Sequence, residues 1–349
     1  MNWKRALATI LALSLLLIPA GCGSKETGKE PQKAETSKTQ AKTISLVIAS
    51  CCVTEDVTTK ELIPNFEKYW KDKTGEDVKI QASFAGSGTL TNQILGGDPK
   101  QVAILSSDLY AQNLQGKGLT GTDWKSFPNQ GIVARSVIVF LVRQGNPKGI
   151  KTFEDLAKPG IQIIHSSPAT SGGAQWSIYS IYGSALKMAE ASGAKPDKEK
   201  AAELLKKVEA NVIAMPESSK QAAAQFASGQ GDVLVTYENE ALLELEKGEK
   251  YEIVVPKATV ETDWTVVKLD QNIAPDQQKV ADGFIEFLFT ESAQKSYAKF
   301  GFRSYKPEIT AQYSKYAKVE LPFNIDYLGG AKAARQTIID DLWQKIQKK

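Results

Sequence analysis

The residues best suited to chemistry in this sequence are small and uncharged, and they lie in the segment 170–176. This segment reads Thr-Ser-Gly-Gly-Ala-Gln-Trp. A serine hydroxyl can donate a hydrogen bond, and glycine lets backbone N–H groups approach a ligand because no Cβ atom is in the way. If a helix begins here, its first N–H groups are free and carry a partial positive charge. The segment therefore predicts a site for a small anion, although a capped turn without a ligand can have the same sequence.

The segment 170–176 lies between a predicted strand and a predicted helix. Residues 161–165 are a short apolar and β-branched run, which is typical of a buried strand. Residues 174–187 carry apolar side chains at helical spacing. In open α/β sheets, ligands bind beyond the carboxyl ends of strands, where helices begin. The segment is thus expected at the edge of a sheet where ligands bind.

Similar junctions recur along the chain. Strands and helices alternate from residue 44 onward, which predicts an α/β fold. Small or hydroxyl residues occupy four further junctions between a predicted strand and a predicted helix: residues 51–54, 86–88, 218–219 and 236–237. One such junction could arise by chance, but several that are spread over the whole chain are harder to explain in this way.

The composition excludes several other kinds of site. The 43 Lys and Arg residues nearly balance the 40 Asp and Glu residues, and the sequence has no basic stripe, so we expect no nucleic-acid partner. With His165 as its one histidine, the chain cannot form a Cys/His zinc site of the usual kind or a triad that needs a second histidine. We predict no metal and no cofactor, so that local dipoles must hold the anion.

An enzyme that acts on sulfate or phosphate esters is the alternative from another functional class. No nucleophile–base pair or Walker-type loop is found in the sequence. Glu238 and Glu240 are paired carboxylates at a predicted helix start, and we interpret them as solvent-exposed capping residues. An adhesion or chaperone module is a third alternative, but it would not require several junctions suited to an anion. We therefore predict a binding protein and not an enzyme.

The N-terminus has the pattern of an export signal. Lys4 and Arg5 precede an apolar run over residues 6–18, which is too short to span a bilayer. Cys22 follows a pair of small residues, which resembles a bacterial lipoprotein signal. We predict a signal peptide over residues 1–21, a lipid on Cys22 that anchors the protein to the outer side of the cell membrane, and a flexible tether over residues 22–42. A plain secretory signal or an uncleaved anchor are the alternatives.

Two adjacent cysteines lie at the end of the first predicted strand. A disulfide between neighbours is disfavoured by geometry, and the remaining cysteine is the predicted lipid site. We interpret Cys51 and Cys52 as small apolar residues at the strand end.

Several of these segments together resemble the sulfate-binding proteins of ABC importers. The resemblance extends from about residue 44 to about residue 343, and it is carried mainly by residues 85–88 (Ala-Gly-Ser-Gly), 170–176 and 231–243, with support from 140–147, 251–256, 301–303 and 323–326. It implies capture of sulfate outside the cytoplasm and its delivery to the permease subunits of an importer. Thiosulfate, molybdate, tungstate and phosphate are the alternative ligands.

The resemblance also implies a fold and an arrangement of domains. The family has a type II periplasmic binding protein fold, in which two α/β lobes close over the ligand and are joined by two crossover segments. By analogy, lobe 1 comprises residues 43–135 plus 257–349 and lobe 2 comprises residues 136–256. We expect a monomer.

In the family the anion is held by neutral donors, which are mostly backbone N–H groups at helix starts. Carried over by position, the resemblance assigns the ligand-binding positions to Cys52, Ser87, Ser171, Gly172, Gly173, Ser219 and Tyr237. Ser171 is expected to contribute its hydroxyl group. The first position is uncertain by one residue, since Val53 fits it as well as Cys52.

Two positions depart from the family pattern. Tyr237 replaces the usual indole, and a phenol can accept a hydrogen bond as well as donate one, which would admit a protonated anion such as hydrogen phosphate. Gln175 replaces the usual arginine, which would weaken long-range attraction of the anion. The alternatives are that Tyr237 only packs between the lobes and that Gln175 is an ordinary helix-surface residue.

Overall fold

The computed structural model describes residues 43–348, which belong to one compact unit. The predicted signal peptide, the lipid site at Cys22 and the tether lie outside these residues. Within residues 43–348, every helix is either too short or too polar to cross a bilayer.

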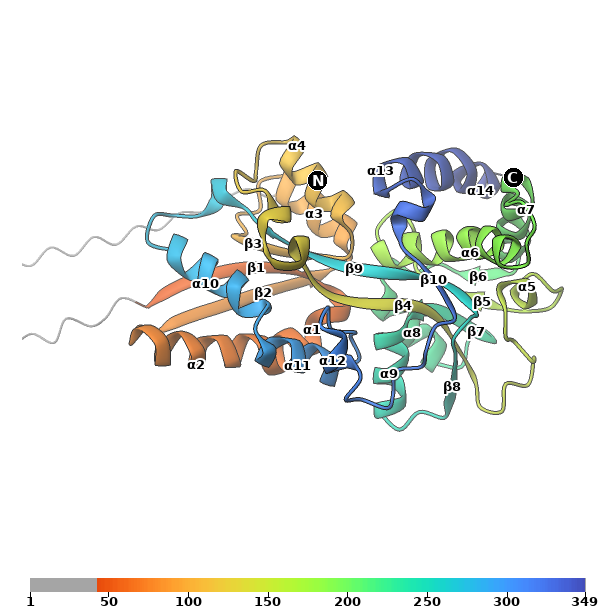
Figure 1. The fold of residues 1–349 in the computed structure, drawn as a ribbon, viewed down its shortest axis with the longest axis horizontal. Helices are drawn as coiled ribbons and strands as arrows, with labels where there is room; N and C mark the ends of the chain where they lie inside the picture. The colour runs from red at the N-terminus through yellow and green to blue at the C-terminus, as the bar shows by residue number, and fades with distance from the viewer. Residues whose placement is uncertain (1–42, 349) are drawn as a thin grey trace, which may run out of the picture. The chain divides into compact units, whose positions relative to one another are not determined.

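Ten strands form the sheet at the centre of the fold (Figure 1). In chain order they are β1 (Ile44–Cys51), β2 (Val78–Ala85), β3 (Val102–Leu105), β4 (Ile132–Arg143), β5 (Ile163–Ile164), β6 (Val212–Ala214), β7 (Val233–Tyr237), β8 (Tyr251–Val254), β9 (Ala258–Lys268) and β10 (Leu321–Phe323). Their order in the sheet is β2-β1-β3-β9-β4-β7-β5-β6, while β10 pairs with β9 and β8 pairs with β4.

The sheet consists of two groups of strands that share two long strands. In the first strand group, β1 pairs in parallel with β2 and β3, and β3 pairs with the end of β9. In the second strand group, β5 pairs in parallel with β6 and β7, and β7 pairs with the end of β4. Strands β4 and β9 pair with each other between the two groups, and Figure 1 shows them running from one group to the other.

Helices flank both strand groups, and several of them begin within a few residues of the end of a strand. The α-helices are α1 (Glu55–Val57), α2 (Ile63–Thr74), α3 (Ser87–Leu95), α4 (Asp108–Gly116), α5 (Phe153–Leu156), α6 (Gly172–Ala191), α7 (Lys198–Glu209), α8 (Ser219–Ala227), α9 (Glu238–Glu246), α10 (Gln278–Leu288), α11 (Glu291–Lys299), α12 (Pro307–Thr310), α13 (Ala331–Ala334) and α14 (Gln344–Gln347). Short 3-10 helices are η1 (Cys52–Thr54), η3 (Trp124–Ser126), η4 (Pro128–Gly131), η5 (Asp270–Asn272) and η6 (Ile325–Leu328), and π-helical turns are η2 (Thr58–Leu62) and η7 (Arg335–Trp343).

The predicted alternation of strands and helices agrees with the structure. The amphipathic pattern of residues 198–209 predicts a helix with these bounds, and α7 has them, with Asp197 capping its first turn. The long strands are longer than predicted: β4 begins at Ile132 and β9 at Ala258, whereas the sequence predicted starts at residues 136 and 265. Both extensions lie where β4 and β9 pair with each other, so a partner distant in the chain stabilises residues whose own pattern is weak.

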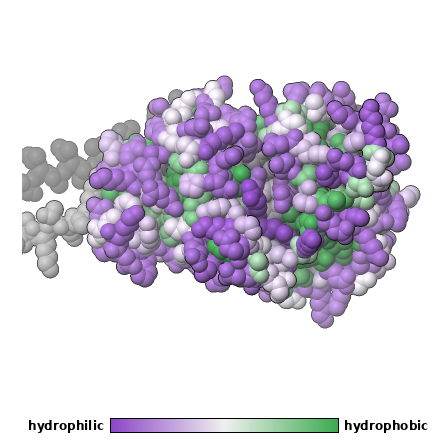
Figure 2. Space-filling view, viewed as in Figure 1, coloured by the Kyte–Doolittle hydropathy of each residue, from purple (hydrophilic) through white to green (hydrophobic). Residues whose placement is uncertain are grey.

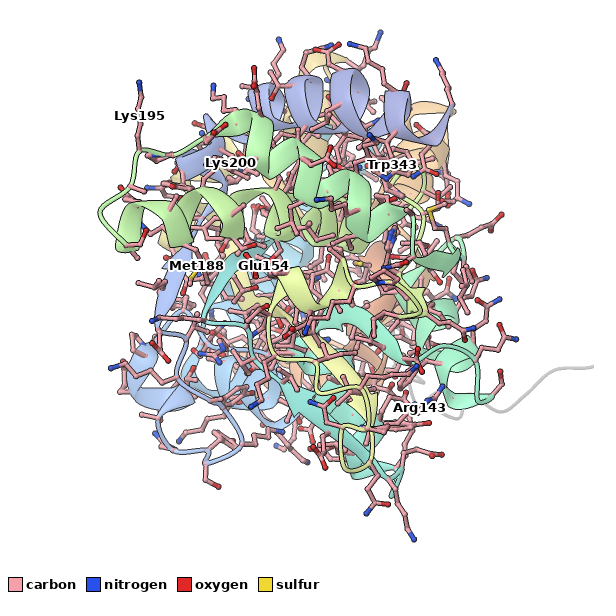
Figure 3. All side chains as sticks on the ribbon, turned by 90° about the vertical axis from the view of Figure 1, so that its right-hand side faces the viewer. Arg143, Glu154, Met188, Lys195, Lys200 and Trp343 are labelled. Atoms are coloured by element: carbon pink, nitrogen blue, oxygen red, sulfur yellow. The ribbon has the colours of Figure 1, made fainter. Side chains whose placement is uncertain are left out.

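The C-terminal segment packs on helices of the second strand group. The turn η7 contacts α6 and α7, and the Trp343 indole donates a hydrogen bond to Glu209 Oε2 at 2.7 Å. Figure 3, which labels Trp343, shows this segment lying beside α7. Hydrophilic residues predominate on the face drawn in Figure 2. The C-terminal segment therefore packs against α6, the helix that begins within the segment 170–176.

Candidate anion site

The start of α6 brings four of the predicted ligand-binding residues together. A Cβ atom added to Gly173 would lie 2.2 Å from Ser219 Oγ, 2.8 Å from Tyr237 Cε2 and 3.3 Å from Ser171 Oγ. The hydroxyl of Ser166 donates to Ser171 Oγ at 2.9 Å and lies 3.3 Å from Ser219 Oγ. The starts of α6, α8 and α9 thus meet at one place at the carboxyl ends of the second strand group.

The start of α3, in the first strand group, faces the same place. Ser106 donates from its backbone N–H and its hydroxyl to Ser87 Oγ, at 3.0 and 2.9 Å. A Cβ atom on Gly172 would lie only 1.9 Å from Ser106 Oγ, and one on Gly86 would lie 2.5 Å from the carbonyl oxygen of Thr170. At Gly86 the added atom would meet backbone, which cannot rotate away, whereas at Gly172 it would meet the side chain of Ser106. The two strand groups therefore approach each other closely here, and glycine leaves room for this approach.

The helix starts in this region keep their donors available. Ser171 is the N-cap residue of α6, but its hydroxyl makes no capping hydrogen bond and lies instead beside Ser166 and Ser219. Gly86, the N-cap residue of α3, has no side chain that could cap. The first N–H groups of an α-helix have no acceptor within the helix. Those of α3 and α6 can therefore bind an external anion.

The adjacent cysteines lie beside the same helix starts. Cys51 and Cys52 are buried and not in a disulfide. Hydrogen bonding by Cys52, with smaller contributions from Ser87 and Trp264, lowers the pKa of the Cys51 thiol to about 7 against the opposing effect of burial. The short helix η1, which begins at Cys52, contacts α8, which begins at Ser219. All seven predicted ligand-binding positions are thus neighbours, and their contact with a ligand stays a prediction.

Tyr237 lies fully inside the protein, and its hydroxyl has no hydrogen-bond partner within residues 43–348. Burial raises the pKa of this phenol well above its ordinary value, and the nearby Cys51 adds to the rise. The phenol is therefore neutral at physiological pH and can donate a hydrogen bond. Its ring also packs on Trp264, with centroids 4.9 Å apart, so packing and ligand contact are both available to it.

The interpretation of Glu238 and Glu240 as solvent-exposed is wrong. Both side chains are buried at the start of α9. Glu238 accepts two hydrogen bonds from Arg303, at 2.6 and 2.8 Å. Burial, together with repulsion by Glu244, raises the pKa of Glu240 to about 8. The sequence could not indicate these environments, because Arg303 lies 65 positions away in the chain.

The interpretation of Gln175 as a helix-surface residue is also wrong. Its side chain is buried, and its amide donates to Tyr110 Oη at 3.0 Å and to the carbonyl oxygen of Pro168 at 3.2 Å. The next residue, Trp176, donates from its indole to the carbonyl oxygen of Ser106 at 2.6 Å. Gln175 and Trp176 therefore connect α6 to residues of the first strand group. An arginine at residue 175 would make different contacts there.

Sequence reasoning missed three residues of this region. Ser106 and Ser166 directly follow strands, so the rule that identified the other junctions could have found them. Trp264 lies within β9 and has no such signal, since it reaches the region only through the pairing of distant strands.

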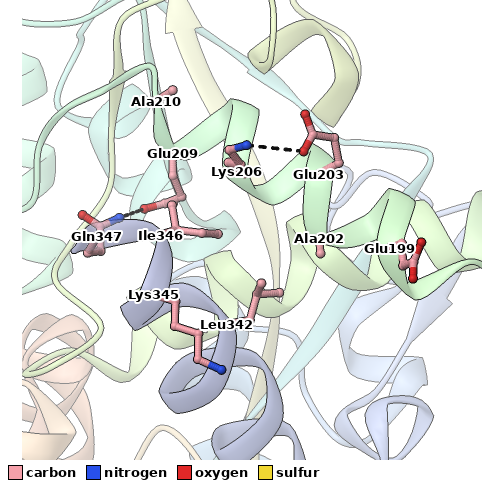
Figure 4. Close-up of a pocket in the computed structure, with 10 residues that line it drawn as sticks. All are labelled: Glu199, Ala202, Glu203, Lys206, Glu209, Ala210, Leu342, Lys345, Ile346 and Gln347. Carbon is pink, nitrogen blue, oxygen red and sulfur yellow. Dashed lines mark hydrogen bonds and ion pairs between the residues drawn. The ribbon is translucent and has the colours of Figure 1, made fainter. Parts of the chain in front are cut away.

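The larger cavities lie away from this region. One of about 580 Å³ lies between α7 and α14 and is lined by Leu342, Ile346 and charged side chains (Figure 4).

Glu209 borders this cavity and hydrogen-bonds His165 Nε2 at 3.0 Å, while His165 Nδ1 bonds the carbonyl oxygen of Ser166 at 2.8 Å. Burial lowers the pKa of His165, but the charge of Glu209 and these hydrogen bonds outweigh it and raise the pKa. His165 is thus a buried structural residue behind Ser166.

Comparison with known proteins identifies the family. A model of the family described as bacterial extracellular solute-binding protein matches residues 48–303. The chain belongs to this family. A sulfate-binding protein of Synechococcus elongatus is 32% identical over 97% of this chain and 94% of its own length. A thiosulfate-binding protein of Pseudomonas aeruginosa is 32% identical over 83% of this chain and 84% of its own length.

A solved structure agrees with this assignment. The sulfate-binding protein SubI of Mycobacterium tuberculosis H37Rv superposes with a TM-score of 0.76 at 26% identity, covering 85% of this chain and all of that one. The predicted resemblance to the sulfate-binding proteins and the predicted periplasmic binding protein fold are both confirmed. This solute-binding protein therefore shares its fold and family with receptors that bind small oxyanions.

Proposed function

We propose that this solute-binding protein captures sulfate outside the cytoplasm and delivers it to an ABC importer. One observation carries the proposal: the starts of α3, α6 and α8 and the unpartnered hydroxyl of Tyr237 converge on one buried place. The seven predicted ligand-binding residues carry no charged side chain. Such a site suits a fully ionised anion, which needs donors only.

The arrangement of lobes belongs to the same proposal. Lobe 1 comprises residues 43–135 plus 257–349, lobe 2 comprises residues 136–256, and the lobes close over the anion. Contacts such as that between Gly172 and Ser106 support a closed form. The segment η7, which this division places in lobe 1, packs on α6 and α7 of lobe 2. Binding then stabilises the form that the importer recognises.

The cellular setting is proposed from the N-terminal sequence. Cleavage before Cys22 and its lipidation would anchor a monomer to the outer side of the membrane through residues 22–42. The family description as extracellular supports this location. We propose that the protein is a receptor without enzymatic activity.

The ligand is tested by calorimetric titration of residues 43–349 in anion-free buffer. We expect one sulfate per monomer and weaker binding of thiosulfate, which the relative from Pseudomonas aeruginosa is named for. Molybdate, tungstate and phosphate complete the series. If none of these anions produces heat or a thermal shift, the receptor function is wrong. A preference for thiosulfate would replace sulfate as the ligand.

Ser171→Ala should weaken sulfate binding by about 1–2 kcal/mol, roughly 5- to 30-fold, because one donor to a charged group is lost. The hydroxyl caps no helix, so the melting temperature without sulfate should change little. Ser218→Ala is the matched control, since the Ser218 hydroxyl caps α8 by accepting from the Gln221 N–H at 3.2 Å. That variant should lose stability and retain affinity. Unchanged affinity in Ser171→Ala would remove this hydroxyl from the site.

A further inference from the structure

Trp264 is a buried donor beside the candidate site to which no role is assigned. It lies in β9 and is fully buried. Its indole nitrogen has no hydrogen-bond partner within residues 43–348. A buried N–H group without an acceptor is unfavourable, so this indole is a candidate donor to a group that is not part of the chain.

Aromatic contacts fix the position of the Trp264 ring. It packs on Tyr237 with centroids 4.9 Å apart at 52°, and on Phe302 with centroids 5.0 Å apart at 90°. The hydroxyl of Tyr237 is the second buried donor without a partner at this place. Two buried donors on adjacent rings are therefore both free to bind an acceptor that is not part of the chain.

The edge of the indole that carries its N–H group faces residues of the first strand group. Trp264 contributes to lowering the pKa of the Cys51 thiol, as do Cys52 and Ser87. The Trp264 indole is therefore close to the Cys51 thiol, although its N–H group forms no hydrogen bond there. Cys52 and Ser87 are themselves predicted ligand-binding positions, so this edge of the ring borders the anion site.

We propose that the indole N–H of Trp264 is a second aromatic donor to the bound oxyanion, next to the phenol of Tyr237. This inference rests on the proposed function. An indole can only donate, whereas a phenol can also accept. Trp264 thereby restores from β9 the indole donor that Tyr237, the last residue of β7, replaces. With this donor in place, the site keeps its preference for an anion without a proton, despite Tyr237.

The test compares Trp264→Phe with the unaltered protein by calorimetric titration with sulfate and with phosphate at pH 6. Phenylalanine keeps an aromatic ring against Tyr237 and removes the N–H group. We expect sulfate affinity to fall about 5- to 30-fold, as for loss of one hydrogen bond to a charged group. The ratio of sulfate to phosphate affinity should fall as well, which a purely structural effect would not cause.

Trp70→Phe is the matched control. The indole nitrogen of Trp70 is also buried without a partner, but its ring packs in the core against Phe66 and Gly283. This variant should bind sulfate like the unaltered protein. It separates the loss of a donor at the site from the general effect of shortening a buried tryptophan.

The indole proton supplies a second measurement that does not depend on the folding of a variant. In a ¹H–¹⁵N spectrum of the unaltered protein, the Trp264 indole signal should move downfield on saturation with sulfate, and that of Trp70 should stay. If sulfate binds but the Trp264 signal stays or Trp264→Phe keeps full affinity, the inference is wrong and the receptor function stands. If the unaltered protein binds no oxyanion, both fail.

Discussion

Replacing Arg303 by glutamine should lower the free energy of unfolding by about 3–5 kcal/mol, the usual cost of removing one partner of a buried ion pair. Arg303 donates two hydrogen bonds to Glu238, whose side chain is only 2% exposed, and a third to the carbonyl oxygen of Ala317. Without Arg303, Glu238 stays buried next to Tyr237 with an uncompensated charge. Urea denaturation without sulfate measures the loss.

The loss caused by Arg303→Gln should depend on pH. Burial already raises the pKa of Glu238, despite the opposing effect of Arg303. A carboxyl group whose pKa is raised by folding holds its proton more tightly in the folded state, so stability falls as the pH rises through this range. Removal of Arg303 raises the pKa further. The deficit should therefore be larger at pH 8 than at pH 5.

The matched control for Arg303→Gln is Arg335→Gln. Arg335 Nε donates to Asp340 at 2.9 Å, with both side chains about 30% exposed, and such pairs contribute about 0–1 kcal/mol. Equal losses in the two variants would show that the Glu238–Arg303 pair stabilises the fold no more than an exposed ion pair does. A loss in Arg303→Gln that does not change with pH would contradict the expected effect of the Glu238 charge.

Gly86→Ala should weaken sulfate binding by about 3 kcal/mol, or roughly 100-fold, which is the upper end of the usual cost of overpacking. The added Cβ atom would lie 2.5 Å from the carbonyl oxygen of Thr170. Both sides of this contact are backbone, so no side-chain rotation relieves it. Gly86 follows β2 and Thr170 precedes α6, so the clash opposes closure of the two lobes over the anion. Calorimetric titration with sulfate measures the effect.

The fold itself should tolerate alanine at residue 86. The φ and ψ angles of Gly86 are −60° and 142°, which alanine adopts without strain. In the proposed open form the clash is absent, so the melting temperature without sulfate should change little. Gly116→Ala is the matched control, because a Cβ atom there meets open space. Wild-type affinity in Gly86→Ala would contradict closure through this contact.

The sequence by itself determined the local parts of this protein. Helical and strand periodicity predicted α7 and the other amphipathic elements, since these patterns depend on neighbours within about ten residues. The junction rule pointed to residues 86–88, 170–176 and 218–219, which contain the observed helix starts at residues 87, 172 and 219, because small residues before a helix have a physical reason to be small. The family resemblance then added the expected function, which the comparisons support.

Only the tertiary structure decided which side chains surround those helix starts. Trp264 reaches Tyr237 through the pairing of β9 with β4, and Arg303 reaches Glu238 from 65 positions away. Gln175 is buried because Tyr110 of α4 lies opposite it. Such contacts join residues far apart in the chain and leave no periodic trace in the sequence. The sequence therefore predicted where an anion could bind, and tertiary packing decided which aromatic and charged side chains surround that place.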